Sequence, residues 1–175
     1  MDSKLCAAFT DSSARRLRQY RDRIGKCLDL LDEDQIWIRG SANANAVGNL
    51  LLHLSGNVRQ WIVSGVGGAP DGRIREVEFA AAGGLTKAQL FDRLNGTVEE
   101  ACAVIDGLDG VALVGERTIQ AYPVTVLEAV YHVVEHFAMH TGQIIFATKA
   151  LTGEDLGFYR HLAKGAPPTH DEKTP

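Results

Sequence analysis

The stretch VTVLEAVYHVVEHFAMHTGQIIFATKALTG, residues 124–153, carries both a start signal and a stop signal for one helix. Thr125 and Glu128 have the spacing of a capping box, which marks the start of a helix. Gly153 stands just past the last apolar residue, where helices commonly end. Apolar residues recur at helical spacing between these signals. The stretch therefore predicts one long helix that follows Pro123 and runs to about Leu151.

Three other stretches also have helical character. The expected helices span residues 3–31, about 43–64 and 86–106, with Asn43 or Asn45 as the N-cap of the second and a Thr86–Gln89 capping box on the third. The expected connections are a glycine-rich turn over 65–73, an irregular segment over 74–84 and a briefly extended segment over 112–123. The pattern predicts an all-α four-helix bundle with long inter-helix connections. We expect residues 1–163 to form a single domain and residues 164–175 to be a disordered tail.

Composition limits the class of protein. A net charge of −4 and a pI near 5.8 argue against nucleic acid or an anionic membrane as the main partner. The arginines of the first helix are expected to be a solvated surface rather than a nucleic-acid stripe. The sequence shows no secretory signal and no membrane span. The three cysteines are odd in number and widely spaced, so we predict reduced thiols in a cytoplasmic protein.

Two of the expected helices carry a polar ribbon on an otherwise apolar surface. At about 100° per residue, four polar residues of the last helix fall within about 80° of one another. They are His132, His136, His140 and Gln143. The second helix has a similar ribbon of Asn49, His53, Asn57 and Gln60. Polar groups inside a bundle must be paired or bind something, so facing ribbons would bring His53 to the histidines of the last helix.

Histidines four residues apart on one helix can chelate a divalent ion, and a third from another helix completes a set of three nitrogen ligands. Such a set suits Zn²⁺ or Ni²⁺, and also Mn²⁺, Fe²⁺ or Co²⁺, and leaves a position open for water or substrate. Each residue also has a plainer interpretation: a lone His53 as a hydrogen-bonded core residue, and Asn57, Gln60 and Gln143 as links between helices. No HExxH, ExxH, GxSxG or Walker A motif is present.

Three segments resemble the DinB-like superfamily, in particular an uncharacterised bacterial subfamily. They are NAVGNLLLHLSGNVRQWI, PDGRIREVEF and HVVEHFAMHTGQIIFATKALTG with the following GFY, and the resemblance extends from about Leu17 to Tyr159. It implies a four-helix bundle, often homodimeric, with one divalent ion held by His53, His136 and His140. The histidine pair precedes a TGQ segment at Thr141–Gln143, as in the family. His132 then lies outside the ligand set.

The resemblance also implies a chemistry. Relatives include bacillithiol and mycothiol S-transferases and a mycothiol-dependent maleylpyruvate isomerase. We therefore expect a metal-dependent enzyme acting on a small molecule, with a low-molecular-weight thiol as co-substrate and metal-bound water or thiolate as the reactive group. His132, Asn57, Gln60 and Gln143 would orient ligands or substrate. The alternatives are a metal-dependent hydrolase and a non-enzymatic, stress-related dimeric bundle that binds metal. The sequence singles out no general base.

Overall fold

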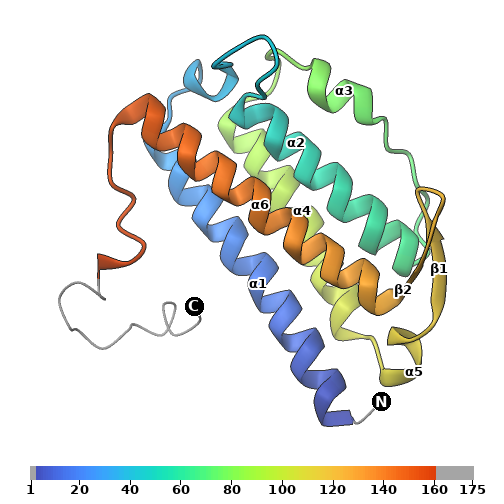
Figure 1. Ribbon diagram of the computed structural model, residues 1–175. Coiled ribbons are helices and arrows are strands. Elements are labelled where there is room, and N and C mark those ends of the chain that lie inside the picture. The colour runs from blue at the N-terminus through green and yellow to red at the C-terminus, as the bar shows by residue number, and fades with distance from the viewer. Residues whose placement is uncertain (1–2, 161–175) are drawn as a thin grey trace.

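Four long helices form the body of the protein in this computed structural model, which describes residues 3–160 (Figure 1). They are α1 (Ser3–Leu30), α2 (Val47–Val58) with its π-helical continuation η2 (Arg59–Val66), α4 (Lys87–Asp106) and α6 (Val126–Thr152). Both α1 and α2 pack against α4 and α6, so α1 and α2 occupy opposite corners of the bundle. The predicted all-α four-helix bundle is confirmed.

Shorter elements fill the connections. They are the 3₁₀ turn η1 (Gln35–Trp37), the helices α3 (Arg75–Ala80) and α5 (Gly110–Leu113), and the antiparallel strands β1 (Glu116–Ile119) and β2 (Tyr122–Thr125). The two strands form a hairpin whose turn residues Gln120 and Ala121 have φ of 52° and 67°. Positive φ at both turn residues matches the right-handed twist of the strands. The hairpin is the small exception to the helical class.

The helix ends follow the predicted capping chemistry. Thr86 accepts a hydrogen bond from the backbone N–H of Gln89, and Thr125 accepts one from that of Glu128. The Glu128 carboxylate in turn accepts a hydrogen bond from the backbone N–H of Thr125 at 2.7 Å. Gly153 ends α6 with a φ of 72°, a conformation that glycine adopts without strain. These local signals fix where α4 and α6 begin and where α6 turns away.

Three local predictions were wrong. The N-cap of α2 is Ala46 rather than Asn43 or Asn45, and the Asn49 side chain accepts the Ala46 N–H at 3.1 Å. The second helix does not stop at Ser64 but continues to Val66 in π form. Segment 74–84 contains α3, which packs against α2. A six-residue helix of this kind depends on tertiary contacts, because isolated short helices are marginal.

The core fills the space between the four helices. The largest fully buried side chains include Leu17 and Ile24 of α1, Leu54 of α2, Leu94 of α4 and Phe137 of α6. The three cysteines are buried and free. Within residues 3–160, no helix is both long and apolar enough to cross a membrane. The predicted tail over 164–175 and the last three residues of the predicted domain lie outside the described residues.

The first-helix arginines do not form an isolated stripe. Arg18 and Arg21 both contact the Glu99 carboxylate of α4, at 3.0 Å and 2.5 Å. The guanidinium of Arg23 lies 5.4 Å from the ring centre of Phe158, next to the end of the described chain. Arg18 is 39% exposed, which agrees with the solvated-surface interpretation, whereas Arg21 is 15% exposed.

Candidate metal centre

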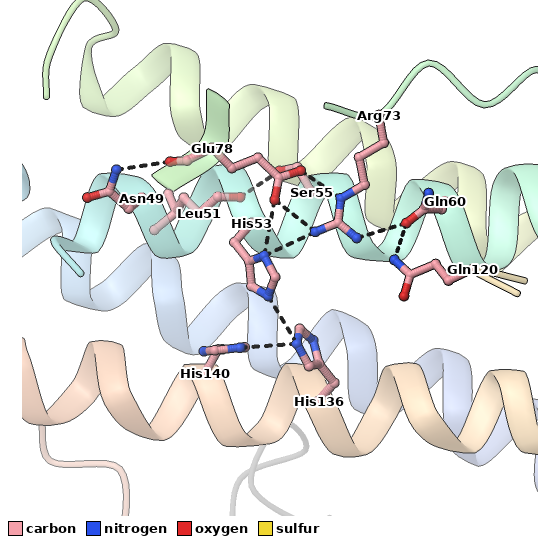
Figure 2. Close-up of polar contacts among 10 residues, drawn as sticks. All are labelled: Asn49, Leu51, His53, Ser55, Gln60, Arg73, Glu78, Gln120, His136 and His140. Carbon is pink, nitrogen blue, oxygen red and sulfur yellow. Dashed lines mark hydrogen bonds and ion pairs between the residues drawn. The ribbon is translucent and has the colours of Figure 1, made fainter. Parts of the chain in front are cut away.

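Three histidines from two helices converge between α2 and α6 (Figure 2). Nε2 of His136 lies 3.1 Å from Nε2 of His53 and 3.1 Å from Nε2 of His140. One nitrogen from each of the three residues lies within 4.8 Å of the others. His53 is buried, and His136 and His140 are half-buried on α6. The structure thus brings together the three histidines that the resemblance selected.

The register of the two helices selects these histidines. His136 and His140 are one turn apart on α6, so both can face the same point on α2. His53 lies at that point, and two turns further along α2 the ring of Trp61 packs against His132, with 4.2 Å between ring centres. Helices α2 and α6 are therefore antiparallel. The His132 ring packs on an indole, and its centre lies 5.6 Å from that of His136.

Hydrogen bonds to the outer nitrogens set the protonation of two of the rings. Nδ1 of His53 lies 3.1 Å from Oε2 of Glu78, and Nδ1 of His140 lies 2.7 Å from Oε1 of Gln143. A carboxylate oxygen and an amide carbonyl oxygen can only accept. In the tautomers that satisfy both acceptors, each Nδ1 carries the proton. Each neutral ring then presents an Nε2 lone pair toward His136.

His136 cannot satisfy both lone pairs. A neutral imidazole has at most one N–H at Nε2, so at least one of the two 3.1 Å contacts joins two lone pairs unless a cation lies between them. Burial, followed by the neighbouring charges of His140 and His53, lowers the pKa of His136 to about 3. Burial also lowers the pKa of His140, although its bond to Gln143 partly offsets this. His136 and His140 therefore take up an extra proton less readily than a free histidine does.

A divalent metal ion fits the same geometry. Zinc–nitrogen bonds of about 2.0–2.1 Å in a tetrahedral arrangement place ligand nitrogens roughly 3.3–3.4 Å apart. Two of the observed separations are 3.1 Å. Nδ1 of His136 is buried without a hydrogen-bond partner among the described residues. Metal-bound histidines usually donate from this second nitrogen to a carbonyl, a carboxylate or a water.

An arginine and a carboxylate support the outer side of His53 (Figure 2). Arg73 donates from Nε to Oε1 of Glu78 at 2.7 Å and from Nη2 to Oε2 at 2.8 Å. Both side chains are buried, with 5% and 8% of their surface exposed. Burial alone would raise the pKa of Glu78, but the hydrogen bonds and charges of Arg73 and His53 outweigh it and lower the pKa. Glu78 is therefore ionised at neutral pH.

The other residues predicted around the site have different surroundings. Gln143 contacts His140 directly, as described above. Gln60 accepts from Nη1 of Arg73 at 3.0 Å and donates to Asp71 at 2.7 Å. Gln60 is thus linked to His53 through Arg73. Asn57 is buried, and its Oδ1 has no partner among the described atoms.

Sequence reasoning missed Arg73 and Glu78. Both lie in the segment PDGRIREVEF, which carried part of the resemblance but no assigned role. The available signal was a carboxylate with an arginine five residues before it, close after a helix that bears a histidine. Two surface cavities, of about 500 and 440 Å³, are lined by residues that include Trp37 and Phe91 respectively, and neither is lined by the histidines.

Solved structures share this fold at low sequence identity. A conserved protein from Enterococcus faecalis matches with a TM-score of 0.72 and 16% identity, over 83% of this chain and 98% of that one. A DinB-like protein from Bacillus cereus ATCC 10987 matches with a TM-score of 0.66 and 14% identity, over 85% and 93% of the two chains. No curated protein matches the sequence. A family model described as "Protein of unknown function (DUF1572)" matches residues 4–163, so this chain belongs to the DUF1572 family.

Proposed function

We propose that His53, His136 and His140 hold one divalent metal ion, Zn²⁺ or Ni²⁺ in first place, and that the protein is a metal-dependent enzyme acting on a small molecule. The observation that carries this proposal is the convergence of two Nε2 lone pairs on a third Nε2, 3.1 Å from each. Such an arrangement is costly without a cation and favourable with one.

The donor set supports an open coordination position. Among residues 3–160 the cluster contains three candidate ligands, whereas a structural zinc site has four protein ligands. A bound divalent ion would supply Lewis acidity, which lowers the pKa of a coordinating thiol or water. The chain's own residues aim the imidazoles: Gln143 lies against Nδ1 of His140, and Glu78 lies against Nδ1 of His53.

Thiol-dependent S-transfer is the leading reaction. A thiol sulfur would form a bond to an electrophilic carbon, whose leaving group departs with the bonding electrons, and the thiol proton would pass to solvent. Hydrolysis is the second choice, because the same ion can activate water. The homodimer and the cytoplasmic location stay predictions from the sequence.

Metal content tests the ligand assignment. Protein purified without a nickel column should contain close to one divalent ion per chain by elemental analysis. His136→Ala should remove most of it, since this residue is central to the cluster, and His132→Ala should leave most of it in place because its ring packs on Trp61. Equal metal loss in the two variants would contradict the assignment.

A spectroscopic titration separates the enzymatic from the structural interpretation. Protein loaded with Co²⁺ should change its d–d absorption and gain a charge-transfer band when small thiols are added at neutral pH, without loss of the ion. An unresponsive spectrum would favour a closed, non-enzymatic site, and S-transfer would no longer be the leading proposal. If the spectrum does respond, turnover of thiol and electrophile must still be measured directly.

A further inference from the structure

We propose that α3 and the preceding Arg73 are a positioning device for the metal centre: Glu78 selects the Nδ1–H tautomer of His53, and Arg73 holds Glu78 in place. This inference rests on the proposed metal site, because its purpose is to present the Nε2 lone pair of His53. It adds two residues on a segment that carries none of the candidate ligands.

The first support is the way in which Glu78 is buried. Ionised carboxylates are seldom buried without a partner. Glu78 has both oxygens engaged, Oε1 by Arg73 and Oε2 by Arg73 and His53. A buried ion pair is weak evidence for stability, since well-packed apolar residues often do as well. The pair is better explained by what it orients, namely the imidazole 3.1 Å from Oε2.

The second support is a competition at Nδ1 of His53. Nη2 of Arg73 also lies 3.1 Å from this nitrogen, and a guanidinium can only donate. Nδ1 can therefore donate to Glu78 or accept from Arg73, and the two choices give opposite tautomers. Oε2 of Glu78 already accepts from Nη2 of Arg73 at 2.8 Å and can accept from Nδ1 as well, so donation to the carboxylate is the choice that leaves Nε2 its lone pair. Without Glu78, Arg73 would donate into Nδ1 and move the proton to Nε2, which would block the metal.

The third support is how firmly this segment is fixed to α2. The Asn49 side chain donates to the backbone carbonyl of Glu78 at 2.9 Å and to that of Ala81 at 2.7 Å. Gln60 accepts from Arg73 at 3.0 Å. At Gly56 a Cβ atom would collide with Oε1 of Glu78 and lie 2.9 Å from Nε of Arg73, so only glycine leaves room for the pair. The device is thus anchored on both sides of His53.

The tautomer can be measured in metal-free protein. Long-range ¹H–¹⁵N NMR of histidine-labelled protein at pH 7.5 should show His53 with its proton on Nδ1. In Glu78→Ala the proton should move to Nε2. In the double variant Glu78→Ala/Arg73→Ala the bias toward Nε2 should weaken, because the competing donor is gone. A wild-type His53 protonated on Nε2, or an unchanged Nδ1–H form in Glu78→Ala, would overturn the proposal.

Metal affinity provides the second measurement. Loss of a carboxylate behind a ligating histidine typically weakens metal binding by about 10–100-fold. We expect a loss of that order in Glu78→Ala and a smaller loss in the double variant. Glu76→Ala is the matched control, because Glu76 lies exposed on the same short helix and should leave affinity unchanged. Equal affinity in wild type and Glu78→Ala would refute the positioning role.

Failure of this inference and of the proposed function can be told apart. A wild-type protein that binds no divalent ion would refute the metal site, while the NMR comparison would still decide the tautomer. Glu78→Gln keeps the size of the side chain and covers the case in which the alanine variant does not fold. It should weaken metal binding less than Glu78→Ala does but still measurably, because an amide is a weaker acceptor than a carboxylate. Behaviour identical to wild type in both assays would count against the proposal.

Discussion

Replacing Gly56 by alanine should destabilise the protein by about 2–4 kcal/mol, although glycine to alanine is usually a stabilising change inside a helix. The helix propensity term favours alanine by roughly 0.8–1 kcal/mol. The added methyl group, however, would overlap Oε1 of Glu78 and approach Nε of Arg73 to 2.9 Å. The carboxylate can swing away only by giving up Arg73 and His53. Breaking a buried ion pair costs about 3–5 kcal/mol, which exceeds the propensity gain.

Urea unfolding of the metal-free proteins measures this difference. Gly96→Ala is the control, because Gly96 lies within α4 and a Cβ there would meet nothing within 4 Å. The control should gain up to about 1 kcal/mol from helix propensity alone. A Gly56→Ala protein as stable as wild type, or stabilised like the control, would refute the packing argument for the Arg73–Glu78 pair.

Three further changes test other parts of the structure. The folded pKa of His136 is about 3 and its ordinary value is 6.5, so metal-free protein should lose stability as the pH falls from 6.5 toward 3, by at most about 1.4 kcal/mol per pH unit, and His136→Gln should flatten this slope in urea titrations. Thr125→Ala should lower the unfolding free energy by about 1 kcal/mol through loss of the α6 cap, with no change in metal content. Arg18→Ala should cost less than about 1 kcal/mol in thermal unfolding, because Arg18 and its partner Glu99 are 39% and 44% exposed, and a larger loss would contradict a solvated role.

Helix ends could be predicted because the chemistry that sets them is local. Thr86 and Thr125 cap their helices through residues three positions away, and Gly153 adopts positive φ directly after α6. These interactions need nothing from the rest of the chain. The N-cap of α2 shows the limit of this reasoning. Ala46 has no capping side chain, and the position is fixed instead by Asn49, whose amide also binds the carbonyls of Glu78 and Ala81.

Helix α3 and the role of Glu78 could not be predicted for the same physical reason. The six residues of α3 have no strong start or stop signal, and their helix is maintained by packing on α2. Which of its acidic residues points inward depends on the close approach that Gly56 allows. Glu76 and Glu78 look alike in the sequence, yet the first is exposed and the second is buried.

The choice among the three histidines of α6 also depended on tertiary structure. His132, His136 and His140 have identical spacing, so periodicity alone allowed either neighbouring pair to join His53. The family resemblance favoured the second pair. The physical reason is the antiparallel register of α2 and α6, which places His53 beside His136 and His140 and places Trp61 beside His132.

The charges around the centre indicate what kind of fourth ligand it would favour. The three imidazoles are neutral when they bind metal, and the charges of Arg73 and Glu78 cancel one another. A divalent ion would therefore keep nearly its full charge within this shell, unlike an ion held by carboxylates, and an anion in the fourth position would be strongly attracted. In the Co²⁺-loaded protein, azide and small thiols should perturb the visible spectrum at lower concentrations than neutral amines do. Arg73→Ala should reverse part of this preference, because the charge of Glu78 would then be unbalanced beside the ion. A centre that bound neutral amines more tightly than anions would contradict this account of its charge.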